Sequence, residues 1–133
     1  MMYDTDGYSY AIGVKLNFPI HHEALITPTE DPEVLKYHGN DNILQYRRRS
    51  DREYHRLDGP ALINLTTGVK MWYRYGKCHC ETGPAIEDPE LGWVEFHIDG
   101  VKLNPRIAVN DPFFIKKFPL LVASMLIYLV HEQ

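Results

Sequence analysis

One 24-residue pattern occurs twice in succession between residues 55 and 102, and it constrains the fold more than any other feature of this sequence. The first copy is HRLDGPALINLTTGVKMWYRYGKC and the second is HCETGPAIEDPELGWVEFHIDGVK. Six of the 24 columns are identical, whereas chance pairing at ordinary composition would give about one or two. The identical pairs are His55/His79, Gly59/Gly83, Pro60/Pro84, Ala61/Ala85, Gly68/Gly92 and Gly76/Gly100. Residues 55–78 and 79–102 are therefore predicted to form two copies of one structural unit.

Each copy has the turn chemistry of β-hairpins. Both open with a Gly-Pro turn, in which glycine accepts a positive φ and proline fixes φ and removes a donor. An apolar strand, a glycine turn, an aromatic strand and a closing glycine turn then follow, so that turns recur about every 8 to 10 residues, as in an antiparallel meander. In the second copy, Pro89 cannot donate to a ladder, and its segment is expected to be an edge strand or a bulge.

The succession G-P-A, G, W-Y-x-x-G-K and H-x-x-x-G-P-A resembles the hairpin repeats of phage and giant-virus proteins, which are described as variants of the MORN repeat. The resemblance covers residues 54–103 approximately. It implies an elongated β-meander, a viral origin and contacts with proteins or lipids, and it supplies no catalytic residue. Two copies are few for a free-standing array of such repeats, and Cys80 occupies the column of Arg56.

The composition is that of a soluble globular protein. The chain has 133 residues, of which 44% are hydrophobic and 24% charged, enough for one domain (residues 1–133) with a proper core. Its net charge of −4 argues against a general affinity for nucleic acid. Cys78 and Cys80 lie too close in sequence for a structural disulfide, so free thiols in a reducing compartment are expected. The N-terminus lacks the basic and apolar parts of a signal peptide, which favours a cytoplasmic location, in the host cell if the protein is viral.

Charge and pattern divide the chain into three regions. Residues 1–42 hold seven acidic and two basic groups, with a strand expected over residues 8–16 and a short helix starting at residues 29–33. Residues 43–103 form the meander, and their first strand, beginning at residues 43–46, is expected to pair with the first strand of the first copy. Residues 104–133 are helical, with a helix opening at Asp111-Pro112 and a break before Pro119.

The segment from Phe118 to Val130 has only Ser124 as a clearly polar residue. It is too short for a bilayer span, which takes about 20 residues. A helix that is apolar on all faces must be buried by the sheet or by another chain, so a homo-oligomer through this helix is one prediction. We therefore predict an α+β fold: a twisted antiparallel sheet of about five to seven strands, built partly from the two hairpin repeats, with the apolar C-terminal helix packed on one face.

The cluster best suited to a metal ion combines Cys78-His79-Cys80 with His55 and His97. Zinc ligands usually come as C-x2-4-C or H-x3-5-H clips, and strand alternation sends His79 away from the two cysteines. His55 and His79 are better interpreted as residues that hydrogen-bond a turn, so no metal and no cofactor are predicted.

No catalytic motif is present. His21-His22-Glu23 is interpreted as a solvated loop, and the sequence has no nucleophile elbow, phosphate-binding glycine loop or zinc-protease motif. The prediction is a protein that is not an enzyme, and a metal-dependent enzyme is the weakest alternative.

Five arginines in residues 47–56 form the main local signal for binding. Guanidinium groups can grip phosphates or carboxylates, and Tyr46 and Tyr54 could stack on bases. The same arginines can instead protect an exposed edge strand or pair with the acidic N-terminal third, and these readings stay open. If Trp72 and Arg74 are exposed, they would add to this stretch two residue types that are enriched at protein interfaces. The predicted contact residues are Arg47, Arg48, Arg49, Arg52, Arg56, Trp72 and Arg74.

The functional prediction is a non-enzymatic, phage-encoded interaction protein that binds and inhibits a host macromolecule such as a defence component. A viral protein is the other possible type of protein partner. The alternative is a nucleic-acid-binding accessory protein that uses residues 47–56. Because the copies differ at Arg56/Cys80 and Arg74/Ile98, any binding face is expected on the first copy.

Overall fold

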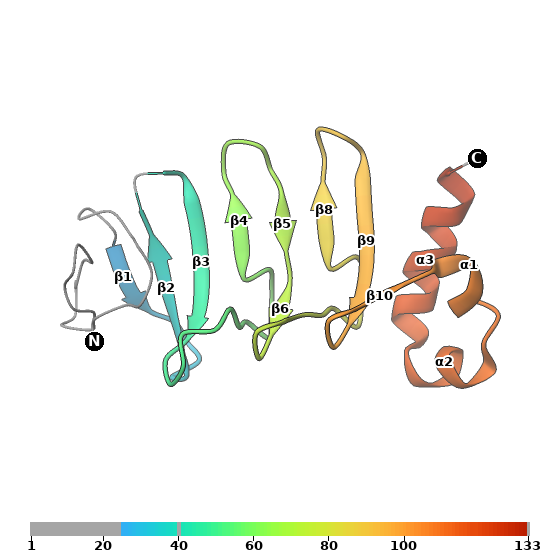
Figure 1. Cartoon of the computed structure of the whole chain (residues 1–133), viewed down its shortest axis with the longest axis horizontal. Helices are drawn as coiled ribbons and strands as arrows, with labels where there is room; N and C mark the ends of the chain where they lie inside the picture. Colours follow the sequence, from blue (N-terminus) through green and yellow to red (C-terminus); the bar gives the residue numbers. More distant parts are fainter. Residues whose placement is uncertain (1–24, 40, 133) are drawn as a thin grey trace.

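A computed structural model describes residues 25–39 and 41–132, which form one long antiparallel sheet followed by three helices (Figure 1). The strands are β1 Leu25–Pro28, β2 Val34–His38, β3 Ile43–Arg48, β4 Leu62–Asn64, β5 Lys70–Met71, β6 Tyr73–Arg74, β7 Lys77–Cys78, β8 Ile86–Asp88, β9 Trp93–Ile98 and β10 Val101–Leu103. The helices are α1 Pro105–Ala108, α2 Pro112–Lys117 and α3 Pro119–His131. Eight strands follow the order β1-β2-β3-β4-β5-β8-β9-β10, and β6 pairs separately with β7. The predicted α+β class and the antiparallel meander are confirmed.

The predicted number of strands was too low, because the sheet has eight in the part of the chain that the structure describes. The aromatic segment after Gly68 does not remain one strand. It divides at Trp72, so that β5 stays in the large sheet beside β8 while β6 turns back onto β7. The expected pairing of residues 43–46 with the first strand of the first copy is confirmed, since Gln45 lies opposite Leu62.

The helix predicted to start at residues 29–33 is wrong. Asp31 does begin a local turn, in which its amide donates to Thr29 Oγ1 (3.1 Å) and its carboxylate accepts from the Glu33 amide (2.9 Å). The chain then extends as β2, because Val34 and Tyr37 fit a buried strand between β1 and β3. The strand predicted at residues 8–16 and the histidine pair at residues 21–22 lie outside the described residues.

Pro89 also has a different role from the predicted edge or bulge. It lies in the turn between β8 and β9, and β8 pairs on both sides, with β5 and with β9. Asp88 Oδ1 accepts the amides of Glu90 (3.1 Å) and Leu91 (3.3 Å), an Asx turn that leaves the proline without a ladder position to interrupt.

The turns that close the two copies are the left-handed type favoured in two-residue hairpins. Tyr75 and Gly76 have φ of 52° and 79°, and Asp99 and Gly100 have φ of 49° and 83°. Two successive positive φ values match the right-handed twist of the flanking strands, and glycine supplies the second of them without steric strain.

The C-terminal helices begin where local signals place them. Asp111 Oδ1 accepts the amides of Phe113 (3.0 Å) and Phe114 (3.3 Å), so the predicted start of α2 is confirmed. The break before Pro119 is confirmed as well, since α2 ends at Lys117 and α3 begins at Pro119. The short α1, capped by Asn104, was not predicted. None of the described helices is long and apolar enough to cross a membrane.

The helices lie at the β9–β10 end of the sheet (Figure 1). Phe96 of β9 is packed with Ala108, Leu121 and Met125, and Val94 and Ile98 border this core. A second core forms around Val34, Tyr46 and Ala61 near the other end. The predicted packing of the helix on one face of the sheet therefore needs correction, because α3 packs at the β9–β10 end of the sheet, where its Ser124 also lies close to Gly83. Its opposite side stays exposed.

Candidate interaction site

The arginines of residues 47–56 contact their own chain. The Arg47 guanidinium lies 4.1 Å from the centre of the Tyr54 ring and donates to the Arg52 carbonyl (2.7 Å). Arg48 forms an ion pair with Asp51 and lies over the Tyr75 ring at 5.0 Å. The hydrogen bond from Arg48 lowers the pKa of Asp51, against the opposing effect of burial.

Arg49 and Arg56 are held in the same way. Arg49 Nε donates to the Pro32 carbonyl (3.1 Å). Arg56 lies 3.9 Å from the centre of the Tyr46 ring, pairs with Asp58 Oδ1 (3.0 Å) and donates to the Pro60 carbonyl (3.1 Å). These contacts hold both guanidinium groups against side chains and carbonyl oxygens of the same chain.

Three predicted contact residues do come together in one hollow. Arg56, Trp72 and Arg74 line a depression of about 210 Å³ together with Leu57, His79, Cys80, Glu81 and Thr82. Arg74 Nη2 lies 3.1 Å from Glu81 Oε2, and His79 Nε2 lies 2.9 Å from the same oxygen. The His79 hydrogen bond, followed by the Arg74 charge, lowers the pKa of Glu81, so this carboxylate is ionised at neutral pH.

A second, larger hollow of about 500 Å³ shares Arg56 and Leu57 with the first. Its remaining lining comes from the β1–β2 turn, β2, β3 and Asp58. Leu57 is 58% exposed although it borders both hollows. We call Arg56, Leu57, Trp72 and Arg74 the Leu57 patch. Leu57 was missed by sequence reasoning, and its only signal was an apolar residue between charged ones directly before a turn.

His55 and His79, which occupy the same column of the two copies, accept hydrogen bonds from the closing turns. His55 Nδ1 accepts the Tyr75 amide, and His79 Nδ1 accepts the Asp99 amide, each at 2.9 Å. The predicted hydrogen bond to a turn is present in both cases, and the turn is the one at the end of each copy. Both rings are buried, and burial followed by the Arg48 charge lowers the pKa of His55, which keeps its ring a neutral acceptor.

The surroundings of the two cysteines do not favour a reactive thiolate. Burial, the Glu95 charge and Cys80 raise the pKa of Cys78 to about 11, so its thiol stays protonated at neutral pH. Cys80 is buried beside Thr82. Across residues 25–39 and 41–132, no group of three or more His, Cys, Asp or Glu side chains is placed to hold a metal ion.

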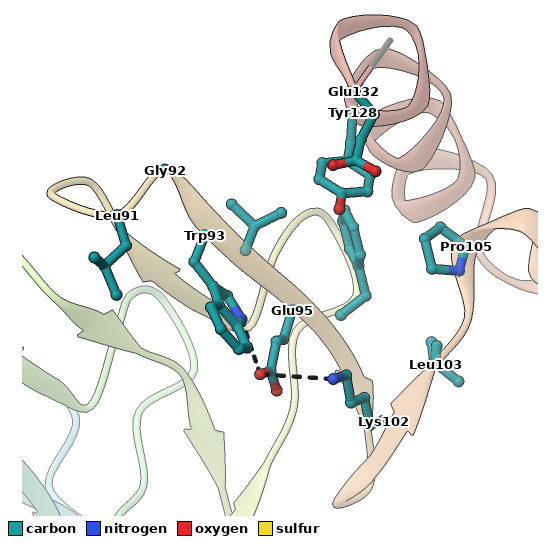
Figure 2. A pocket seen from close by; sticks show the side chains of 11 residues that line it. Leu91, Gly92, Trp93, Glu95, Lys102, Leu103, Pro105, Tyr128 and Glu132 are labelled. Atoms are coloured by element: carbon teal, nitrogen blue, oxygen red, sulfur yellow. Dashed lines mark hydrogen bonds and ion pairs between the residues drawn. The ribbon is translucent and has the colours of Figure 1, made fainter.

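A third hollow of about 340 Å³ lies between the last hairpin and α3, with Tyr128 on the helix side (Figure 2). Glu95 projects into it between Trp93 and Lys102, accepting from Trp93 Nε1 (2.9 Å) and lying 3.7 Å from Lys102 Nζ. His97 contacts the other Glu95 oxygen at 2.9 Å, and this hydrogen bond is the main cause of the lowered pKa of Glu95. The sequence signal that could have revealed this hollow was Glu95, a carboxylate in the column where the first copy has Met71.

Comparison with known proteins gives no relative. No protein-family model, curated protein or solved structure matches this chain.

Proposed function

We propose that this chain is a non-enzymatic interaction protein that binds another protein through the Leu57 patch. The observation that carries the proposal is a 58% exposed leucine bordered by two hollows and placed beside a tryptophan and two arginines. Tryptophan and arginine are enriched at the energetic centres of protein interfaces, whereas an isolated exposed leucine would need no explanation.

The patch is held in place before any partner arrives. Arg56 is fixed by Tyr46 and Asp58, and Arg74 is fixed by Glu81. Side chains that are already ordered lose less conformational entropy on binding, so more of the contact free energy appears as affinity. Both arginine side chains remain partly exposed, at 24% for Arg56 and 35% for Arg74.

Comparison with the second copy supports a partner that covers the Leu57 patch. Phe96 occupies the same sequence column as Trp72 and is buried by α3, whereas Trp72 is half-buried and lines an open hollow. A partner seated on the first copy would cover Trp72 as the chain's own helix covers Phe96.

The wider architecture in this proposal is a series of hairpin units of one kind, resembling the MORN-variant repeats of phage and giant viruses. Backbone hydrogen bonds that recur at a spacing of 24 residues support it: the Arg56 amide donates to Tyr73 O and the Cys80 amide to His97 O, at 3.1 Å each. The proposed setting is a phage protein in the host cytoplasm, with a host defence component as the partner to be tested first.

The alternative of nucleic-acid binding through residues 47–56 has less support. Tyr54 and Tyr46, the rings that could stack on bases, are covered instead by the guanidinium groups of Arg47 and Arg56 of the same chain. A metal-dependent enzyme has less support still, because Cys78, the last residue of the first copy, has a raised pKa and no donor cluster is present among the described residues.

The test is affinity capture with the Leu57→Glu variant and a matched control, Leu65→Glu. Leu65 is also an exposed leucine, at 50%, and it belongs to neither hollow. We expect Leu57→Glu to lose a protein that both the wild type and Leu65→Glu retain after salt washes. Equal retention by all three proteins would refute the proposal, and tight, salt-sensitive binding of a labelled oligonucleotide that is lost in an Arg47/Arg48/Arg49→Ala variant would favour the nucleic-acid alternative.

A further inference from the structure

The hollow between the last hairpin and α3 lies apart from the Leu57 patch. Its lining comes from the turn before β9, from β9 and β10, and from helices α1 and α3, whereas the patch lies on the first copy. Its volume of about 340 Å³ is within the range of small-molecule sites, which run from about 300 to 1,000 Å³. The hollow is therefore large enough for a small ligand or for one side chain of another protein.

Most of the residues that line the hollow are apolar or aromatic. Trp93 stands on the sheet side and is 50% exposed, and Tyr128 stands on the helix side (Figure 2). The Trp93 indole N–H donates to Glu95 Oε2 (2.9 Å), so the ring is held in place before a ligand enters. Tryptophan binds cations over its ring face better than the other aromatic residues do, so a half-exposed tryptophan beside a carboxylate favours a cationic ligand.

Glu95 is the charged group that faces this ring. Its side chain is only 18% exposed, and the hydrogen bond with His97 lowers its pKa against the effect of burial, so the carboxylate is ionised at neutral pH. Trp93 bonds one of its oxygens and His97 the other, each at 2.9 Å. A carboxylate offers about four acceptor positions. Each oxygen of Glu95 therefore keeps capacity for a further donor.

Lys102 shows which kind of donor fits beside this carboxylate. Its Nζ lies 3.7 Å from Glu95 Oε2, which is longer than a hydrogen bond, and its side chain is 62% exposed. Such a pair contributes little to stability, so Lys102 can be displaced at low cost. Glu132 adds a second carboxylate to the lining, and Arg106, which is outside the lining, approaches it at 3.9 Å. The lining itself thus carries two acidic side chains and one basic side chain.

We propose that this hollow binds an alkylammonium cation, which donates to Glu95 and lies against the ring of Trp93. The ammonium group takes the position that Lys102 approaches, and the alkyl carbons contact the apolar part of the lining. The cation can be a free aliphatic amine or the lysine side chain of another protein, because the two share this chemistry. The proposal does not depend on the Leu57 patch.

The test is a titration of the isotope-labelled full chain with n-butylammonium chloride at constant ionic strength. Nuclear magnetic resonance follows the indole N–H signals of the two tryptophans, and Trp72→Phe assigns the signal of Trp93. We expect a saturable shift of the Trp93 signal with a Kd of about 1 to 10 mM, as suits so small a ligand. The neutral analogue n-butanol and the anion butyrate should each bind at least about tenfold more weakly.

Three variants test the role of the carboxylate. Glu95→Gln keeps an oxygen that can accept from Trp93, and it should weaken binding at least about tenfold because the charge is lost. Glu90→Gln is the matched control, since Glu90 is an exposed carboxylate in the turn before β9 that does not line the hollow, and it should bind like the wild type. Lys102→Gln should strengthen binding about two- to fivefold, because it removes the cation of the chain that competes for Glu95. Far-UV circular dichroism checks that each variant is folded, and Lys102→Gln changes only an exposed side chain.

Several results would overturn the proposal. These are a Trp93 signal that does not shift up to about 100 mM n-butylammonium, an equal shift with n-butanol, equal affinities of Glu95→Gln and Glu90→Gln, and weaker binding by Lys102→Gln. The peptide acetyl-Gly-Lys-Gly-amide distinguishes the two sources of the cation. Tighter binding of the peptide than of n-butylammonium would assign the site to a lysine of a partner protein, and equal or weaker binding would assign it to a free amine.

Discussion

Replacing Phe96 with alanine should remove the side chain that joins the C-terminal helices to the sheet. Phe96 is 2% exposed and packs with Ala108, Leu121 and Met125, and its ring meets the Tyr128 ring edge-on at a centroid distance of 5.6 Å. Truncation of a buried phenylalanine costs about 3 to 5 kcal/mol, because both transfer free energy and packing contacts are lost.

That loss is large for one domain. A domain of this size has a free energy of unfolding of about 5 to 15 kcal/mol, so Phe96→Ala should remove about a fifth or more of it. The midpoint of thermal unfolding should fall by about 11 to 18 °C. Urea titration followed by circular dichroism and tryptophan fluorescence measures the change, and hydrogen exchange at α3 amides shows whether the helices detach before the sheet unfolds.

Trp72→Ala provides the matched comparison, because Trp72 occupies the same column of the first copy but is half-buried and lines an open hollow. Its loss of free energy of unfolding should be about 1 to 2.5 kcal/mol, since only part of the ring leaves water on folding. Phe96→Leu should fall near the same range because most of the apolar volume remains. A Phe96→Ala effect below about 1 kcal/mol, or one smaller than that of Trp72→Ala, would refute the packing argument.

Three further measurements test the hydrogen bonds, the thiol and the turns. Because burial lowers the pKa of His55 below its ordinary value of 6.5, the unfolded chain binds more protons than the folded chain as pH falls below 6.5. Stability should therefore be full above that pH and decline below it, and His55→Asn, which keeps an acceptor near the Nδ1 position, should lessen the decline. Cys78 should react with a thiol reagent at pH 7 at least about tenfold more slowly than in the urea-unfolded chain, because its pKa is raised to about 11. Gly68→Ala should destabilise the chain by about 1 to 3 kcal/mol, since φ is +84° and a Cβ would lie 2.9 Å from Pro89. Gly92→Ala, at φ +65° with open space, should cost only about 1 kcal/mol.

Each of these three predictions would be contradicted by a specific result. Stability that is flat between pH 7 and 5, or that declines equally in His55→Asn, would contradict the burial argument for this histidine. Fast labelling of Cys78 in the folded chain would show that its thiol is not shielded. Equal losses for the two glycine variants would show that the Pro89 contact adds nothing to the cost of positive φ.

Much of the local structure could be predicted from the residues themselves. The start of α2 at Asp111 and the break before Pro119 depend on contacts within a few positions. The closing turns at Gly76 and Gly100 combine local glycine geometry with a hydrogen bond to a histidine 20 residues before the bonded amide. Glycine, proline and capping carboxylates act through their own backbone geometry, so neighbours distant in sequence cannot easily override them.

The candidate site was predicted only in part. Arg56, Trp72 and Arg74 do share one hollow, but the other arginines turn to their own chain, and Leu57 was not foreseen. Whether a guanidinium faces solvent or a tyrosine ring depends on which strands become neighbours, and a single sequence does not display this pairing.

The sequence by itself determined where the closing turns lie, where α2 and α3 start and that a 24-residue pattern occurs twice. The turns and these two helix starts follow largely from local sterics and hydrogen bonding. Only the tertiary structure decided that residues 34–38 are a strand, that the aromatic segment divides at Trp72, and that α3 packs at the β9–β10 end of the sheet with one face and exposes the other. Those outcomes depend on the burial of apolar area between distant segments, and this contribution exceeds intrinsic backbone preference wherever the two compete.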